Sequence, residues 1–131
     1  MADPRLDAGM AVRREVLGDP HVDRAVAGTT EFTAPFQDFV TRCAWGEVWT
    51  RTELDRRTRS CITLAALTAL RADAEIEMHV RAALRNGLTS AEIREVLMHT
   101  AVYAGVPAAN SAFAIAQRTL DEIATTSGSD S

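Results

Sequence analysis

Two pairs of side chains in this sequence have the types and the spacing that proton-transfer chemistry needs. Glu75 lies four residues before His79, and His99 lies four residues before Tyr103. On a helix, residues four apart stack on the same face. A carboxylate one turn from an imidazole can hold one ring nitrogen protonated and leave the other directed at a ligand. The first pair therefore predicts an acid–base site, and the second supplies further candidates for it.

Each pair also has an ordinary structural explanation. His79 falls on the apolar stripe of its expected helix, where a histidine often serves only as a hydrogen-bonded core residue. His99 and Tyr103 lie at the edge of an apolar face, where a polar tip on an apolar body is common in interfaces. Glu95, four residues before His99, offers an exposed ion pair instead. Metal-binding signatures such as HExxH or paired ExxH are absent, so we predict no metal.

The basic residues point to an anionic ligand. All 14 Lys and Arg positions are arginine, so an internal Schiff base, to pyridoxal phosphate or to a keto acid, is excluded. Arginine suits bidentate capture of carboxylates. Four arginines follow the two tryptophans Trp45 and Trp49 within a short stretch: Arg51, Arg56, Arg57 and Arg59.

A solvated helix start explains this cluster most simply. Basic residues at a helix N-terminus nevertheless oppose the macrodipole. We therefore expect a bound anion, or acidic residues of a neighbouring subunit, to balance the arginines, with Trp45 and Trp49 as an apolar wall beside them.

The spacing of apolar residues predicts an all-α fold of about six to seven helices, because no segment alternates with period two. Thr89 and Glu92 form a capping box, and Gly87 fits the position after a helix end. The first three expected helices cover about 11–17, a segment that starts at Asp19-Pro20, and about 34–45, where Gly46 ends the helix. The next runs from its cap Asp55 to about Leu70, and another contains His79 and ends before Gly87. Two more follow, one that starts after Thr89 and a last one that ends at about Ile123.

Length and composition predict one domain over residues 1–131, with an ordered core at about 10–123 and a flexible tail at 124–131. The segment from Ser60 to Leu70 is apolar on nearly every side, so it must be buried all round. One subunit of this size can hardly cover such a helix, and we expect a homo-oligomer.

Several function classes are excluded by composition. The net charge of -4 argues against nucleic acid as a partner. No 18-residue apolar run and no secretion signal occur, so we expect no membrane association and a cytoplasmic protein. Cys43 and Cys61 are separated by 17 intervening residues, which fits neither a CxxC pair nor a zinc site, and we interpret them as two buried thiols.

Six blocks in order, over nearly the whole chain, resemble the carboxymuconolactone decarboxylase family. They are VRREVLGDPHVDRA (12–25), WGEVWTR (45–51), LDRRTRS (54–60), HVRAALRNG (79–87), EIREVL (92–97) and AVYAGVPAAN (101–110). The wider superfamily includes alkylhydroperoxidase D, whose peroxidase site resembles a CxxCxxxH. Ala72 and Glu75 stand at the two cysteine positions here, so a dithiol peroxidase mechanism has no nucleophile, and His79 is the shared residue.

The resemblance implies an all-helical, alkylhydroperoxidase D-like subunit in a hexamer that needs no cofactor. The implied reaction is decarboxylation of 4-carboxymuconolactone, a butenolide with two carboxylates, to β-ketoadipate enol-lactone in aromatic catabolism. On this hypothesis Arg51 binds the acetate carboxylate, Glu75 orients His79, and His79 polarises the lactone carbonyl or protonates the ring. His99 and Tyr103 are secondary candidates.

Two alternatives stay open from the sequence. One is an enzyme of the same fold that acts on another lactone or β-keto acid. The other is a helical oligomer that binds a small anion without turnover.

Overall fold

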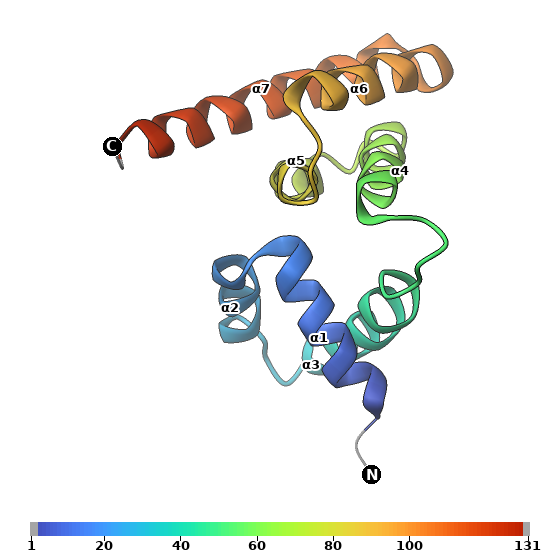
Figure 1. Cartoon of the computed structure of the whole chain (residues 1–131), viewed down its shortest axis with the longest axis vertical. Helices are drawn as coiled ribbons and strands as arrows, with labels where there is room; N and C mark the ends of the chain where they lie inside the picture. Colours follow the sequence, from blue (N-terminus) through green and yellow to red (C-terminus); the bar gives the residue numbers. More distant parts are fainter. Residues whose placement is uncertain (1–2, 130–131) are drawn as a thin grey trace. The chain divides into compact units, whose positions relative to one another are not determined.

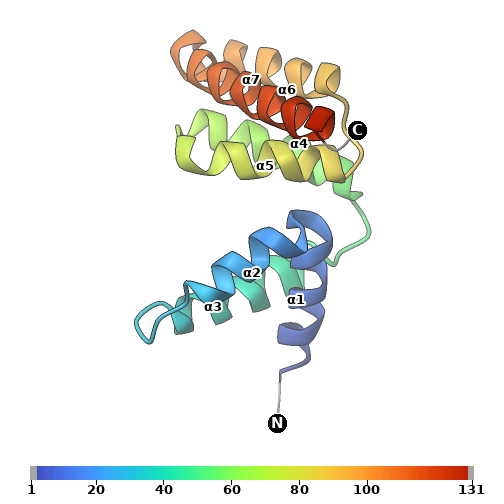
Figure 2. The same ribbon diagram turned by 90° about the vertical axis from the view of Figure 1, so that its left-hand side faces the viewer.

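The computed structural model describes residues 3–129, with side chains as far as Thr126, and the regular structure in this range is entirely helical. The all-α prediction is confirmed. The elements are α1 (Pro4–Leu17), α2 (Asp19–Ala27), α3 (Ala34–Val40), the π-helical segment η1 (Thr41–Val48), α4 (Arg56–Ala69), α5 (Asp73–Arg85), α6 (Ser90–Ala104) and α7 (Val106–Ser129) (Figures 1 and 2).

The helices form two compact units, Met1–Arg56 and Arg57–Ser131. The N-terminal unit contains α1, α2, α3 and η1, and the C-terminal unit contains α4 to α7. The expectation of one domain with a flexible tail stays a prediction. Helix α7 runs past the expected end at Ile123 as far as Ser129, and residues 130–131 of the expected tail lie outside the described range.

The N-terminal unit depends on a close approach between α1 and η1. A Cβ atom on Gly9 would lie 2.1 Å from the carbonyl oxygen of Thr41, and one on Gly46 would lie 2.5 Å from the carbonyl oxygen of Arg5. Glycine at both positions lets the two backbones touch. We expected Gly46 to end a helix at about Trp45, which is wrong. The helical path continues to Val48, because Gly46 provides room for α1 instead of a left-handed turn.

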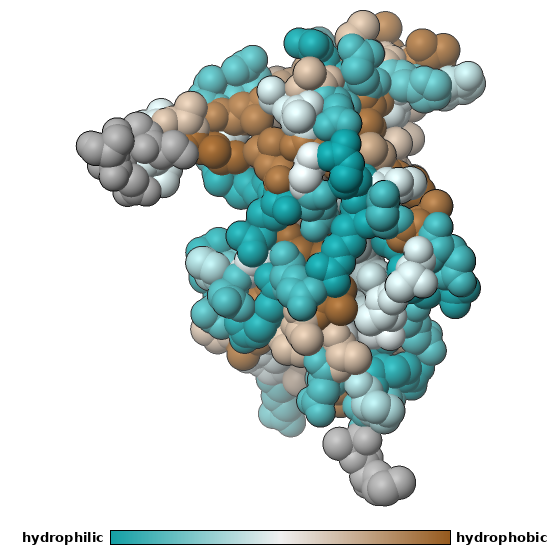
Figure 3. All heavy atoms as spheres, in the orientation of Figure 1, coloured by the Kyte–Doolittle hydropathy of each residue, from teal (hydrophilic) through white to brown (hydrophobic). Residues whose placement is uncertain are grey.

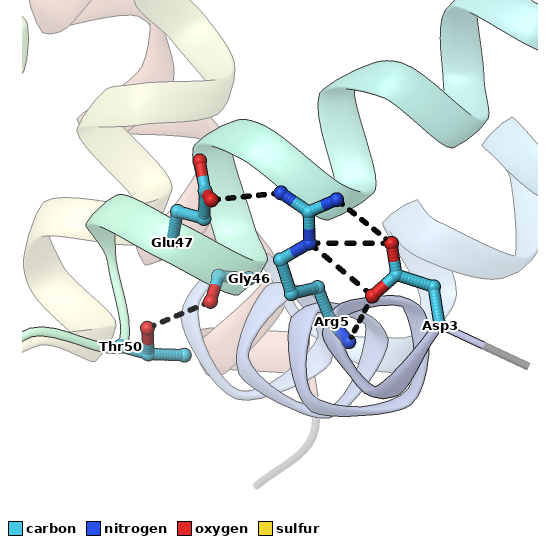
Figure 4. A network of polar contacts seen from close by, with 5 residues as sticks. All are labelled: Asp3, Arg5, Gly46, Glu47 and Thr50. Carbon is cyan, nitrogen blue, oxygen red and sulfur yellow. Dashed lines mark hydrogen bonds and ion pairs between the residues drawn. The ribbon is translucent and has the colours of Figure 1, made fainter.

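An ion pair connects the beginning of α1 to the end of η1. Arg5 bonds to Asp3 at 2.8 Å and to Glu47 at 2.7 Å, as Figure 4 shows. The hydrogen bonds from Arg5 lower the pKa of Asp3 to about 2. Asp3 also caps α1 by accepting from the Arg5 backbone, so this helix begins well before the expected residue 11. The Asp19-Pro20 pair predicts Asp19 as the N-cap of α2 and Pro20 as its first residue, whereas the helix begins at Asp19 and its N-cap is Gly18.

The C-terminal unit has a core built around α5. Ile76, Val80 and Ala83 of α5 are fully buried and pack with Leu64 of α4 and Leu97 of α6. Helices α6 and α7 lie side by side in both views (Figures 1 and 2). The predicted apolar stripe of α5 is therefore confirmed, and it fixes which way the helix presents its polar residues.

The predicted caps of α5 and α6 are also confirmed. Gly87 has a φ of 100° directly after the C-cap Asn86, where glycine is the favoured residue. The Thr89 hydroxyl accepts from the Glu92 amide at 3.1 Å, and the Glu92 carboxylate accepts from the Thr89 amide at 2.9 Å. The bond from the Thr89 backbone lowers the pKa of Glu92. Local sequence chemistry therefore sets the α5–α6 turn.

Helix α4 is covered on one side within the chain. Ser60, Leu64 and Thr68 are buried, whereas Ile62 is 53% exposed and Leu70, just past the helix, is 77% exposed. The expected burial on all sides is therefore not reached within the single chain. The two cysteines, Cys43 and Cys61, are half-buried, so they are less enclosed than expected.

Candidate active site

Helix α5 carries both members of the first predicted pair. His79 is half-buried on the same helix as the core residues Ile76 and Val80. Glu75, in the first turn of α5, is exposed and makes no side-chain hydrogen bond or ion pair within residues 3–126. The structure places the carboxylate one turn before the imidazole, as the spacing requires. The role of Glu75 in orienting His79 stays a prediction.

Helix α6 brings the second predicted pair together. The rings of His99 and Tyr103 stack with centroids 5.2 Å apart and planes at 37°. Both side chains are exposed, Tyr103 at 79%. Glu95 forms no ion pair with His99 in the described part of the chain, so the alternative explanation by an ion pair is not supported. The two rings offer an aromatic surface with two titratable groups.

A pocket of about 360 Å³ opens between α4 and α6. It is lined by Cys61, Ile62, Ala65, Glu95, Val96, His99 and Thr100. His99 is the one predicted site residue in this lining, and Cys61, which its sequence spacing indicates only as a buried thiol, lines the pocket as well. The lining has a carboxylate and no arginine, so by itself it lacks the cation that a doubly negative ligand requires.

The N-terminal unit holds the predicted substrate-binding residues. The rings of Trp45 and Trp49 lie 5.2 Å apart at an angle of 32°, so they form one aromatic surface. Trp45 is 6% exposed and Trp49 is half-buried. Arg51 follows two residues later in an exposed loop, with its guanidinium 3.9 Å from Glu53. The binding of a substrate carboxylate by Arg51 stays a prediction.

Two other arginines of the cluster are balanced inside the chain. Arg56 pairs with Glu15 at 2.7 Å, and Arg57 pairs with Glu92 and donates to the carbonyl oxygen of Gly87. The expectation that an anion or a neighbouring subunit must supply their partners is therefore wrong for Arg56 and Arg57. Carboxylates distant in the sequence reach them through the fold.

The structure thus divides the predicted site between the two units. Trp45, Trp49 and Arg51 belong to the N-terminal unit, and the two histidine pairs belong to the C-terminal unit. In the part of the chain that the structure describes, no three His, Cys, Asp or Glu side chains gather as a metal site would need. That part also contains no helix with the length and apolar character to cross a membrane.

The described residues form an all-α protein with a histidine-bearing helix α5 in its C-terminal unit. The chain belongs to the carboxymuconolactone decarboxylase family, whose sequence profile matches residues 34–118. It is 43% identical over 121 residues to a 4-carboxymuconolactone decarboxylase of Acinetobacter baylyi, covering 92% of this chain and 90% of the relative. Residues 34–118, which the family profile matches, include every predicted site residue.

Two further relatives bear on specificity. A nitrosuccinic acid decarboxylase of Metarhizium robertsii is 42% identical over 117 residues, covering 89% of this chain and 82% of the relative. A short 4-carboxymuconolactone decarboxylase sequence of Pseudomonas putida is 54% identical over 43 residues, which is 33% of this chain and 90% of that sequence. Proteins named for two different acids are therefore about equally similar to this chain.

Proposed function

We propose that this chain is a carboxy-lyase that converts 4-carboxymuconolactone to β-ketoadipate enol-lactone in aromatic catabolism without a cofactor. One observation carries the proposal. The identity of 43% to the Acinetobacter baylyi enzyme extends over 92% of this chain and 90% of the relative, so the similarity is not confined to one segment.

The protein itself has to perform little covalent chemistry in this reaction. Loss of carbon dioxide from the ring carbon pushes an electron pair through the ring alkene into the lactone carbonyl, which gives a dienolate. The ring therefore acts as its own electron sink. The protein must orient the leaving carboxylate, stabilise the developing oxyanion and deliver a proton to the carbon next to the carbonyl.

The half-buried imidazole of His79 suits the last two tasks, because a hydrogen bond to an oxyanion is stronger where water is scarce. Glu75 is the proposed positioning residue for this imidazole, and His99 and Tyr103 are secondary donors. Arg51 is the proposed partner of the acetate carboxylate, beside the surface of Trp45 and Trp49. A firm hold on the carboxylate that stays, with a weak hold on the one that leaves, favours the transition state over the bound substrate.

A second candidate substrate class is favoured by the 42% identity to the nitrosuccinic acid decarboxylase. Nitrosuccinate and 4-carboxymuconolactone share a carbon that bears a carboxylate, a CH2-carboxylate arm and a route for electrons into an acceptor group. The acceptor is a nitro group in one compound and an unsaturated lactone in the other. The same binding groups would therefore serve another activated dicarboxylate, while a non-catalytic anion binder remains the alternative from a different class.

The assembly we propose is a homo-oligomer, a hexamer by family resemblance, in the cytoplasm. Large apolar side chains of the C-terminal unit are exposed, among them Ile62, Leu70, Val102 and Val106. Figure 3 shows hydrophobic surface over α6 and α7. Contiguous apolar surface is uncommon on a monomer and is typical of an interface.

The purified chain is expected to consume 4-carboxymuconolactone with release of one equivalent of carbon dioxide. Loss of the lactone's ultraviolet absorbance gives kcat/KM, and nitrosuccinate is tested as an alternative substrate under the same conditions. If the chain turns over nitrosuccinate and not the lactone, its substrate belongs to the second class. Turnover of neither acid would leave the anion-binding alternative.

Arg51→Met is expected to raise the KM for the lactone by roughly 10- to 100-fold with a smaller change in kcat, because a charge-assisted hydrogen bond contributes about 1.5–3 kcal/mol. Steady-state kinetics measure both constants. Arg85→Met, at an exposed arginine in the last turn of α5, is the matched control and should leave KM unchanged. Equal KM values for the two variants would remove Arg51 from the binding site.

A further inference from the structure

Arg13 is a buried arginine whose polar neighbours are both neutral. It lies on α1 and is only 7% exposed. Its Nη2 donates to the amide oxygen of Gln37 at 3.2 Å, and its Nη1 donates to the hydroxyl of Thr41 at 3.5 Å. The buried Nε has no hydrogen-bond partner. Five guanidinium donors are thus served by two neutral oxygens, one of them at the limit of a hydrogen bond.

The charge of Arg13 is also not balanced. No carboxylate pairs with it among the side chains of residues 3–126, whereas the adjacent Arg14 pairs with Asp19 at 3.1 Å and Asp23 at 2.8 Å. Burial lowers the pKa of Arg13, and the neighbouring charge of Arg14 lowers it further. A buried charge without a partner opposes folding. A residue that opposes folding and breaks a general rule of protein interiors points to a functional role.

The unfilled donors have the geometry of a carboxylate receptor. In a guanidinium, Nε and Nη2 point their N–H groups from the same edge, and two carboxylate oxygens match that edge. The single amide oxygen of Gln37 occupies only Nη2 and leaves Nε empty. Gln37 is half-buried on α3, so its side chain can turn outward and free the whole edge.

We propose that Arg13 binds a small carboxylate, which replaces the Gln37 amide and bonds to both Nε and Nη2. The ligand class is an organic mono- or dicarboxylate. Thr41 remains as a neutral contact that fixes the far side of the guanidinium. The site does not depend on the proposed decarboxylation.

Succinate is the probe for this site. We expect it to raise the melting temperature of the full chain by about 3 °C or more at saturation, relative to sodium chloride of equal ionic strength, because a ligand of the folded state stabilises it by mass action. Arg13→Met should abolish this response, and its own melting temperature should equal or exceed that of the wild type.

Two further variants keep the test independent of damage to the fold. Gln37→Glu places a carboxylate beside Arg13, so it should raise the melting temperature without succinate and remove the succinate response. Arg14→Met removes a half-buried, paired arginine from the same helix and should keep the response. No succinate response in the wild type, or an equal response in Arg13→Met, overturns the proposal.

The source of the carboxylate follows from kinetics on the same variant. If the bound group belongs to the decarboxylation substrate, Arg13→Met raises its KM at least tenfold and changes kcat less. If KM is unchanged while the succinate response is lost, Arg13 serves a separate carboxylate. If the wild-type chain has no decarboxylase activity, the melting measurements still show whether Arg13 binds a carboxylate. The proposed binding site and the proposed decarboxylation are therefore tested independently.

Discussion

His79→Ala is expected to lower the kcat of lactone decarboxylation by at least about a hundredfold, because a positioned acid or base contributes about 10²–10⁴ in rate. The side chain is half-buried on α5 next to Ile76 and Val80, which remain in place when the ring is removed. We therefore expect the helical content to be retained. Turnover at saturating substrate and far-ultraviolet circular dichroism measure the two effects.

Variants on both helices separate His79 from the other candidate acid. His99→Ala removes the imidazole that lines the α4–α6 pocket and stacks on Tyr103. We expect a smaller loss from it than from His79→Ala. A near-wild-type rate in His79→Ala, together with a large loss in His99→Ala, would transfer the proton-donating role to α6. The loss of kcat in Glu75→Gln should be smaller than in His79→Ala and larger than in His99→Ala, since Glu75 acts through the His79 imidazole.

Gly9→Ala is expected to reduce the free energy of unfolding by about 3 kcal/mol or more, at the upper end of what overpacking costs. The added Cβ would lie 2.1 Å from the Thr41 carbonyl oxygen and 2.9 Å from the Gly46 nitrogen. Both are backbone atoms, so no side chain can rotate away, and α1 must move off η1. Urea denaturation measures the loss.

Gly28→Ala is the matched control for this substitution. Its Cβ would meet nothing closer than 3.4 Å, and the φ of Gly28 is -84°, which alanine adopts readily. We expect a change within about 1 kcal/mol. Equal stabilities for the two variants would show that α1 and η1 separate at little cost.

Spacing along the sequence predicted which candidate acid–base residues share a helix face, but it did not predict what surrounds them. Residues four apart on a helix must share a face, so His99 and Tyr103 stack as expected. The same rule places Glu75 one turn from His79 without requiring a contact, and Glu75 is exposed. Whether a side chain is buried depends on the elements packed over it, which the spacing of one helix does not specify.

Local sequence patterns were enough to predict the all-α class, the apolar stripe of α5 and the turn between α5 and α6. These features depend on neighbours within a few residues, as Gly87 and the Thr89–Glu92 capping box show. The continuation of η1 through Gly46 and the lack of a charged partner for Arg13 become visible only in the folded chain. Both depend on contacts between residues more than twenty positions apart, and local spacing carries no information about such contacts.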